Sequence, residues 1–255
     1  MIALEFRLKL SSMYSIRVPY SYQCARTYPL PAPSTIKGLC ANALWQKEGE
    51  NPVKLLKDIQ NKALGATARA EHPIAVSSCT VRVIPMDARL RQYAFTPYID
   101  CLIAFKDGEE ELGKKIAESL KVAPIYLGDS ESLACVLPES VELVPEHNIK
   151  KVFEGDDIPL NSLVRFDLIK NFRENNKGVV LYMQEDPVAV DAVLERYLAP
   201  LCARGDAYYP LEERSYCSSG NGFFIRGRRI AALFPEPPEN DVKGKKIKNF
   251  KRKKT

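Results

Sequence analysis

The sequence predicts an α+β protein whose first half is a ferredoxin-like domain. Three observations lead to this class. The chain of 255 residues is 45% hydrophobic and 27% charged, which suits a protein with a buried core. Apolar residues recur in some stretches at every second position and in others at helical spacing. These stretches follow one another in the order β-α-β-β-α-β, which is the order of a split βαβ motif.

The first predicted strand is Ile2–Leu10, where apolar residues alternate with Glu5, Arg7 and Lys9. This alternation predicts a half-buried strand with the three charged side chains on its open face. The first helix is expected over Ser34–Lys47, because its apolar residues recur at helical spacing behind Pro33. Either Ser34 or Thr35 is the expected N-cap.

The remaining elements of the domain follow in order. They are strands at Val76–Ile84 and Tyr98–Phe105, an amphipathic helix at Glu109–Lys121 and a last apolar strand at Ser132–Leu137. The domain is therefore expected to span residues 1–140. Its second and third strands are joined by a long connection, which we expect to project as a hairpin or loop.

The sequence of the second half predicts a smaller β-rich region over residues 141–234. Strands are expected at Val164–Ile169, Val179–Met183 and Phe223–Phe234, the last folding back on itself at Gly227. A helix is predicted over Pro187–Leu201, with Asp186 as its cap and apolar residues on one face. Residues 235–255 are Pro-rich and then Lys-rich, which predicts a disordered basic tail.

The net charge of +5 is unevenly distributed. Residues 1–106 hold 14 basic and 7 acidic groups, residues 107–234 hold 15 and 22, and residues 235–255 hold 8 and 3. This pattern excludes a uniformly basic nucleic-acid-coating protein and an acidic disordered protein. It leaves open one positive face on the first half, which would suit a nucleic acid.

Several other classes are disfavoured. The longest apolar runs are far shorter than the roughly 18 residues that span a bilayer, so no membrane association is expected. The seven cysteines are scattered without a CxxC pair, which predicts a reducing cytoplasm and neither a metal nor a disulfide framework. No cofactor motif is present, and we expect no cofactor.

The first candidate site lies in Arg26–Leu39 (RTYPLPAPSTIKGL). A stiff proline-rich segment leads into a helix N-terminus, whose free N–H groups and partial positive charge suit a phosphate. Arg26 and Lys37 add charge, Ser34 and Thr35 add hydroxyls, and Tyr28 offers a ring for base stacking. The alternative is an ordinary helix cap behind a proline loop.

Two glycine-containing loops are further candidates. In Tyr126–Leu133 (YLGDSESL), Gly128 would let RNA approach the backbone and Ser130 would donate to a phosphate. Glu131 would pair with an arginine such as Arg26, and the alternative is a structural turn. Gly220 and Gly222 precede a strand and three arginines, which fits either a phosphate-binding loop or a plain hairpin.

Candidates for catalysis are few. His72 and His147 are the only histidines, and neither belongs to a recognisable triad. A structural histidine is the favoured interpretation of both. A metal-independent ribonuclease, which would use a histidine together with a Tyr or a Lys, stays as the alternative.

Two of these motifs resemble a known family. Tyr28–Leu39 (YPLPAPSTIKGL) behind a first strand, and Tyr126–Leu133 (YLGDSESL) further on, resemble the two signatures of the CRISPR-associated Cas-five family in their expected order. Gly220–Phe234 resembles the family's closing element more loosely. The sequence is similar in character to the archaeal subtype I-A branch.

The resemblance implies a non-catalytic RNA-binding subunit of Cascade, the type I interference complex of antiviral defence, with an RRM-like domain of the RAMP superfamily. It would cap the 5′ handle of crRNA, contact the backbone and large subunits, and meet target DNA only indirectly. A thumb between the second and third strands would fall within Gly65–Tyr98. Its basic residues would grip the guide: Arg69, Arg82, Arg89 and Arg91.

Two alternatives stay open beside this interpretation. One branch of the family cleaves precursor crRNA with a Tyr, Lys and His set, which we cannot match in this sequence. A generic RRM-like module outside CRISPR biology is the other.

Overall fold

The structure, a computed structural model, describes residues 1–21, 24–83, 87–128, 132–170, 178–188 and 193–237. Within these residues a six-stranded antiparallel sheet forms the centre of the first half, in the order β3-β6-β1-β8-β7 with β9 also paired to β1. Its strands are β1 (Ile2–Leu10), β3 (Ala63–Ala70), β6 (Tyr98–Phe105), β7 (Ile125–Tyr126), β8 (Leu133–Val136) and β9 (Glu142–Val144). The fold is α+β.

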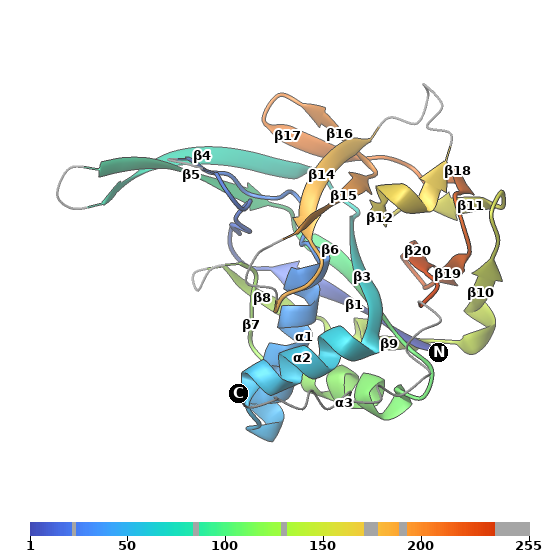
Figure 1. Cartoon of the computed structure of the whole chain (residues 1–255). Helices are drawn as coiled ribbons and strands as arrows, with labels where there is room; N and C mark the ends of the chain where they lie inside the picture. The colour runs from blue at the N-terminus through green and yellow to red at the C-terminus, as the bar shows by residue number, and fades with distance from the viewer. Residues whose placement is uncertain (22–23, 84–86, 129–131, 171–177, 189–192, 238–255) are drawn as a thin grey trace, which may run out of the picture.

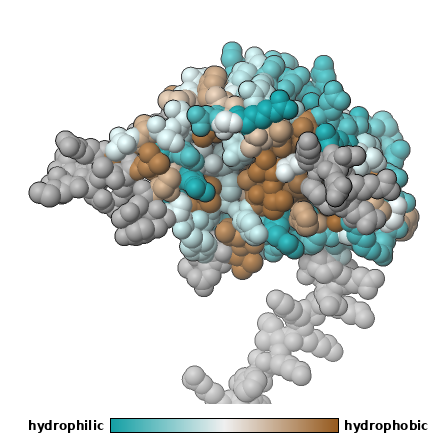
Figure 2. Space-filling view, turned by 90° about the horizontal axis from the view of Figure 1, so that it is seen from above, coloured by the Kyte–Doolittle hydropathy of each residue, from teal (hydrophilic) through white to brown (hydrophobic). Residues whose placement is uncertain are grey.

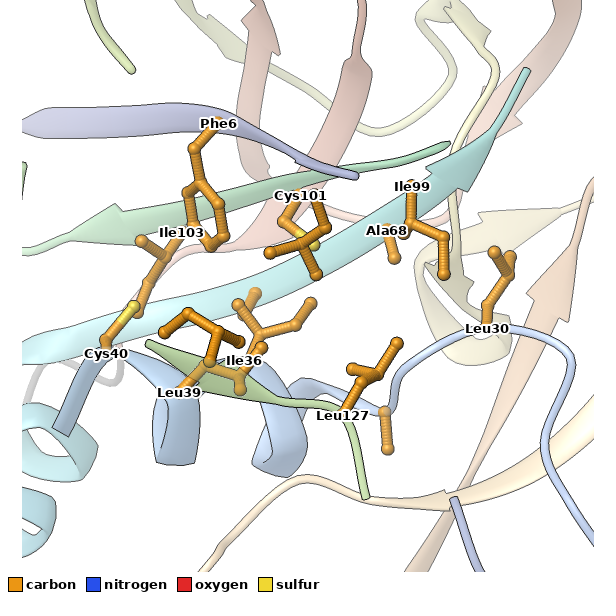
Figure 3. Packing of buried hydrophobic residues seen from close by; sticks show 14 of the residues in the cluster. Phe6, Leu30, Ile36, Leu39, Cys40, Ala68, Ile99, Cys101, Ile103 and Leu127 are labelled. Carbon is orange, nitrogen blue, oxygen red and sulfur yellow. The ribbon is translucent and has the colours of Figure 1, made fainter. Parts of the chain in front are cut away.

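Helices cover one face of this central sheet (Figure 1). They are α1 (Pro33–Glu48), α2 (Pro52–Lys62) and α3 (Glu110–Leu120). Ile36 and Cys40 of α1 pack with Phe6 of β1 and Ile103 of β6 in the main hydrophobic core (Figure 3). The predicted first strand and the predicted helices at Ser34–Lys47 and Glu109–Lys121 are confirmed within one or two residues.

The predicted second strand of the sheet is wrong. Val76–Ile84 does form a strand, but that strand lies outside the central sheet. The sheet instead uses β3, whose sequence ALGATARA has none of the large β-branched residues that mark most strands. Small side chains suit this position because β3 is buried along most of its length.

The connection between β3 and β6 is a long hairpin of β4 (Ile74–Val83) and β5 (Asp87–Phe95), which projects from the body (Figure 1). Three shorter strands extend it into a sheet of order β16-β17-β4-β5-β2. These strands are β2 (Cys24–Ala25), β16 (Leu201–Arg204) and β17 (Ala207–Pro210). The projecting hairpin is thus joined to the second half of the chain through β17.

The rest of the second half forms three small sheets, ordered β10-β19-β20, β11-β18-β13 and β12-β15-β14 among the described residues. The strands are β10 (Ile149–Val152), β11 (Asp157–Leu160), β12 (Val164–Arg165), β13 (Ile169–Lys170), β14 (Val179–Gln184), β15 (Leu194–Ala199), β18 (Arg214–Ser218), β19 (Gly222–Arg226) and β20 (Ala231–Pro235). Short 3₁₀ segments lie at Pro138–Ser140, Glu146–Asn148 and Phe166–Leu168. The β19–β20 hairpin confirms the predicted return at Gly227.

The helix predicted over Pro187–Leu201 is wrong. Asp186 does accept a hydrogen bond from the Val188 N–H at 2.7 Å, so the predicted cap forms a local turn. The chain then becomes strand β15, which pairs along its whole length with β14. The predicted strand Val164–Ile169 is also interrupted, because the segment Phe166–Leu168 is a 3₁₀ turn between β12 and β13.

The second face of the central sheet is covered, so the expectation of a half-buried first strand is wrong. Glu5 is only 1% exposed, because the β19–β20 hairpin packs over it. Its Oε1 lies 3.1 Å from the Arg229 Nε, which is also 3.1 Å from Asp100 Oδ1. Arg7 completes this buried group, since its Nε donates to Asp100 at 2.7 Å.

Strand pairs and a hydrophobic cluster connect the residues on either side of the boundary expected near residue 140. Strand β9 pairs with β1, and β17 pairs with β4. A hydrophobic cluster joins Ala3 and Leu102 to Ile225 and Phe234. No helix among the described residues is long and apolar enough to cross a membrane.

Candidate nucleic-acid interface

Several of the predicted site residues line one of two open hollows. The first, which we call the helix hollow, has a volume of about 390 Å³ and lies beside α1. It brings together Thr35 and Gly38 of the first signature with Tyr126 and Gly128 of the second. Two sequence motifs that are about ninety residues apart therefore meet at one place. The described residues of its lining are Ile16, Arg17, Thr35, Gly38, Leu39, Asn42, Tyr126 and Gly128.

The second hollow, which we call the hairpin hollow, has a volume of about 340 Å³ and lies at the base of the projecting hairpin. It contains the predicted Arg26 and Tyr28, and adds Gln92 of β5, Tyr182 of β14 and Tyr208 of β17. The remaining lining residues are Val18, Thr27, Pro29, Val180 and Leu181. Four separate parts of the chain thus supply its walls, namely residues 18–29, β5, β14 and β17.

The two hollows share a wall. The segments around Ile16–Val18 and Arg26–Tyr28 run antiparallel, with the Val18 N–H donating to Arg26 O at 2.9 Å and the Tyr28 N–H donating to Ile16 O at 2.9 Å. Ile16 and Arg17 face the helix hollow, whereas Val18 and Arg26 face the hairpin hollow. Among the described residues neither lining contains an acid, and each contains one exposed arginine.

The upper side of the molecule, where β4, β14, β16 and β17 lie in Figure 1, mixes apolar and hydrophilic patches (Figure 2). Tyr182 is 55% exposed at the hairpin hollow and Tyr126 is 43% exposed at the helix hollow. Exposed tyrosines beside arginines that form no ion pair within the described residues provide stacking surfaces and positive charge at the same place.

The structure places Lys37 inside the protein. Its side chain is about 2% exposed, and its ammonium donates to Gln60 Oε1 at 2.9 Å and to Glu185 O at 3.1 Å. Burial lowers the pKa of Lys37, an effect that the nearby Glu185 and Asp186 carboxylates oppose. Lys37 therefore holds α1 to the second half of the chain, and reaches neither hollow.

The predicted stacking role of Tyr28 is not supported by its position. The ring is 4% exposed, and its hydroxyl donates to the Tyr182 main-chain oxygen. Burial raises the pKa of this hydroxyl to about 12, so it stays protonated and keeps donating. Tyr28 forms the floor of the hairpin hollow, and the exposed ring beside it is that of Tyr182.

The predicted hydroxyl cap of α1 is wrong. The N-cap is Ala32, with Pro33 as the first helical residue, and no side chain caps the helix. Ser34 and Thr35 both lie in the first turn and are half-buried, and Thr35 lines the helix hollow. The end of the helix with its partial positive charge therefore still lies at this hollow.

The candidate glycines differ in how much space surrounds them. Gly128 has a φ of +97°, and a Cβ there would lie 2.2 Å from Ser15 O, so this glycine is required for the close approach of two backbone segments. At Gly222 a Cβ would lie 2.5 Å from Phe234 O, within the β19–β20 pair. Gly220 has open space around it. Ser130 lies outside the described residues.

The predicted thumb arginines do not form one cluster. Arg69 lies on β3 of the central sheet, where it donates to the Arg229 main-chain oxygen. Arg82 and Arg89 lie in the projecting hairpin, paired with Ala88 and Val81 respectively. Arg91 lies on β5 with its guanidinium 5.1 Å from the ring centroid of Tyr93. Only three of the four thus belong to the hairpin.

Much of the lining carries no signal that predicts it from the sequence. Arg17, Asn42 and Tyr126 of the helix hollow, and Gln92, Tyr182 and Tyr208 of the hairpin hollow, were not candidates. Tyr126 stood inside a recognised motif, so a surface-exposed tyrosine next to a glycine turn was a usable signal. The others come from segments that only the fold brings together.

The two histidines lie apart from both hollows. His72 is exposed and lies beside Tyr98, with ring centroids 6.0 Å apart, and the Arg7 guanidinium lies 5.3 Å from the same tyrosine ring. His147 is exposed in a 3₁₀ segment. Within the described ranges, no three His, Cys, Asp or Glu side chains gather as they would around a metal ion.

Comparison with solved structures shows the fold. A crystal structure of a CRISPR protein from Archaeoglobus fulgidus superposes with a TM-score of 0.62 at 13% identity, covering 93% of this chain and 100% of the other. A Cas protein matches with a TM-score of 0.41 at 16% identity, covering 83% and 98%. A chain of a CRISPR RNA-guided surveillance complex gives 0.42 at 14% identity, covering 85% and 91%.

Comparison at the level of sequence shows the family. No curated protein matches the chain. Residues 3–181, however, match the model of the family described as "CRISPR-associated protein (Cas_Cas5)", which covers more than half of the chain and both hollow-forming signatures. The chain therefore belongs to the CRISPR-associated Cas5 family.

Proposed function

We infer that this protein is a non-catalytic RNA-binding subunit of a type I CRISPR interference complex, in which it caps the 5′ handle of crRNA. Family membership gives the CRISPR context. The observation that carries the RNA-binding role is the pair of hollows with a shared wall, whose described lining residues include no acid. One hollow presents Arg17 with Tyr126, and the other presents Arg26 with Tyr182 and Tyr208.

The arrangement of elements supports a ferredoxin-like domain in this role. The strands β1, β3, β6 and β8 alternate with helices in the order β-α-β-β-α-β, and they lie side by side in the order β3-β6-β1-β8. The β4–β5 hairpin, inserted between β3 and β6, is the proposed thumb. We expect it to close over the guide and to meet the backbone subunit, with the large subunit docking nearby in the cytoplasm.

Single-stranded RNA suits these hollows better than a duplex does. Rings that are open to solvent accept unpaired bases by stacking, and arginines beside them neutralise the backbone phosphates. Asn42 in one hollow and Gln92 in the other add amides that can hydrogen-bond to a base edge. The handle of a crRNA, an unpaired end of defined sequence, is a ligand of this kind.

The test is recovery of RNA with the purified protein. The chain would be expressed beside its CRISPR array and backbone subunit, and the RNA that co-purifies would be sequenced. We expect reads that begin at the handle, and their loss in the double variant Arg17→Ala with Arg26→Ala. A random RNA population, or full recovery of handle reads with the double variant, would overturn the assignment.

The alternative function, cleavage of precursor crRNA without a metal, has one observation in its favour. His72 and Arg7 both lie beside the Tyr98 ring, so a group that can transfer a proton and a cation contact the same tyrosine. Incubating the protein with repeat RNA in EDTA separates the two functions. We expect intact RNA, whereas site-specific cleavage that the His72→Ala variant abolishes would establish the enzyme.

A further inference from the structure

Gly38 lies in the interior of α1, where glycine is less favourable than alanine because it leaves more conformational freedom to the unfolded chain. Apart from its own helix backbone and chain neighbours, no described atom lies within 4 Å of where its Cβ would stand. The other glycine within a described helix, Gly113 of α3, is buried, and a Cβ there would lie 3.5 Å from the Ile2 side chain. Gly113 is therefore packed against the rest of the chain, whereas the bare backbone at Gly38 serves no contact within the described fold.

The bare backbone at Gly38 faces the helix hollow. Thr35, Gly38 and Asn42 are spaced three and four residues apart, so they lie on one side of α1, and all three line this hollow. Arg17 and Tyr126 line it from two other parts of the chain. Gly38 thus forms a floor between two longer side chains, where a flat group can lie against the helix itself.

The amide of Asn42 is held in one orientation by Gln46, one helical turn further on. The Gln46 Nε2 donates to Asn42 Oδ1, and it also donates to Pro124 O at 3.0 Å. An amide nitrogen carries two N–H groups, so both donors of Gln46 are used. Asn42 therefore directs its oxygen toward Gln46, and its NH₂ group is the end of the amide that is left to a ligand.

Hydrogen-bond donors dominate the helix hollow. The exposed Arg17 has donors and no acceptor, and it forms no ion pair within the described residues. Asn42 offers its NH₂ group, and the described lining includes no carboxylate that would accept from either residue. The hydroxyls of Thr35 and Tyr126 can serve in both directions. A ligand with carbonyl and phosphate oxygens complements this set.

From this geometry we propose that the helix hollow holds one base of the RNA strand and selects a keto base, uracil or guanine, over adenine or cytosine. The base lies on the floor at Gly38 with its carbonyl oxygen accepting from the Asn42 NH₂ group, and Arg17 contacts the adjoining phosphate. Adenine and cytosine carry an exocyclic amine where guanine and uracil carry that oxygen, so a donor would face a donor. The volume of about 390 Å³ is at the small end of ligand sites, roughly 300–1,000 Å³, which suits a single nucleotide.

The inference rests on the proposed function, because it takes RNA as the ligand. It goes further by naming the class of base and the residues that choose it. Asn42 determines the specificity by contact with the base, and Gln46 is a positioning residue that acts through Asn42. Gly38 contributes by having no side chain, so its role is visible only when a side chain is added.

The first experiment measures base preference with the purified full chain, by anisotropy of fluorescent RNAs of about eight nucleotides. We expect oligouridylate to bind about tenfold more tightly than oligoadenylate or oligocytidylate. Asn42→Ala should remove this preference. Gln46→Ala keeps Asn42 but frees its amide to rotate, so it should reduce the preference more than the affinity. The ratio of affinities in each variant is compared with the wild-type ratio, because this comparison cancels the different stacking of the free oligonucleotides.

The second experiment adds a methyl group to the floor. Gly38→Ala and its matched control Gly113→Ala should each raise the melting temperature by about 2–4 °C, since both place alanine within a helix. Only Gly38→Ala should weaken binding of oligouridylate, by about tenfold, because its Cβ occupies the place of the base. A variant that becomes more stable while it loses affinity cannot be explained by damage to the fold.

The outcomes distinguish this inference from the proposed function. If Asn42→Ala keeps the wild-type preference, or Gly38→Ala binds as tightly as Gly113→Ala, the hollow does not select a base, and the inference is wrong. The proposed function still stands in that case if Arg26→Ala weakens binding. If the wild type binds none of the RNAs, both fail. If Gly38→Ala binds RNA normally but no longer associates with the backbone subunit, the floor contacts a protein, and the inference is overturned.

Discussion

The ammonium of Lys37 lies 3.1 Å from the main-chain oxygen of Glu185 and 3.8 Å from its Oε1. A lysine in the first turn of α1 therefore fixes the helix to the end of β14 inside the protein. Glu185 in turn accepts from the Tyr197 hydroxyl at 2.6 Å and lies 3.9 Å from an Arg165 guanidinium nitrogen. This polar group connects three elements of the second half to α1.

Replacing Lys37 with alanine should therefore destabilise the protein. The change leaves the Glu185 carbonyl and Gln60 without their donor, and breaking such a buried pair costs on the order of 3 kcal/mol. Denaturant unfolding measures the loss. Lys47→Ala, an exposed change in the last turn of the same helix, should alter the unfolding free energy by less than about 0.5 kcal/mol. A stable Lys37→Ala variant with reduced RNA affinity would contradict this role and restore Lys37 as a phosphate ligand.

Burial of Glu5 gives stability a pH dependence. Burial raises the pKa of its carboxyl above the ordinary value of 4.5, and the nearby Arg229 opposes the shift. Between 4.5 and the folded-state pKa the native protein retains a proton that the unfolded chain has lost. The unfolding free energy should therefore fall as the pH rises through this window. Glu5→Gln, which keeps an acceptor for the Arg229 N–H, should abolish that fall.

Urea unfolding at several pH values compares the variant with the wild type. Glu111→Gln is the control, because Glu111 lies on the exposed side of α3 with a side chain that is 85% exposed. A Glu5→Gln curve parallel to that of the wild type from pH 4.5 to 7 would show that Glu5 does not titrate in this window.

Local signals predicted most of the first half. Pro33 followed by apolar residues at helical spacing gave α1, and the period-two pattern of Ile2–Leu10 gave β1. The same kind of signal marks α2, which went unpredicted: Asn51 caps it by accepting from the Val53 N–H at 2.9 Å, and Pro52 follows. The sequence of strand β3 carries no such signal, because its alanines and its glycine are explained by close packing in the fold.

Long-range pairing decided the elements that the sequence analysis misassigned. Residues 194–199 carry apolar side chains at helical spacing, yet they form a strand, because β14 offers six residues of continuous pairing. The partner of Glu5 lies 224 residues away at Arg229, so no pattern near β1 could reveal that its second face is covered. The same holds for Lys37, whose acceptor at Glu185 lies 148 residues away.

The candidate site was likewise predicted only in part. The signatures containing Thr35 and Gly128 do meet at one hollow, so motif recognition located the place. It did not identify which side chains face the opening, because burial of Tyr28 and Lys37 depends on β14 and on the residues that follow it. Tyr182 and Tyr208, which line the hairpin hollow, lie in segments without any motif.

Substitutions at Gly128 and Gly220 distinguish a glycine that packing requires from a glycine that is free to contact RNA. Gly128→Ala should lower the unfolding free energy by about 2 kcal/mol, because the φ of +97° and the contact with Ser15 O both exclude a Cβ. Gly220→Ala should leave stability within about 0.5 kcal/mol, since nothing surrounds that position. Thermal or denaturant unfolding of the pair measures the difference. Equal stability of the two variants would contradict the close approach at Gly128.

The shared wall of the two hollows gives a prediction about salt. Within the described residues, no ion pair involves Arg17 or Arg26, and each guanidinium is exposed at its hollow. If each contacts one phosphate of a single strand, Arg17→Ala and Arg26→Ala should each reduce the log–log slope of affinity against salt by about 0.7. Because the arginines lie in different hollows, the double variant should lose about 1.4.

Fluorescence anisotropy between low and moderate salt gives these slopes with the RNA that co-purifies. Arg228→Ala is the matched control, because it removes the same charge from an exposed side chain that pairs with Glu142 on the far side of the central sheet. It should lower affinity slightly through the overall field and leave the slope unchanged. An equal change of slope in all three variants would mean that the protein attracts RNA by its general charge, and that neither hollow holds a phosphate.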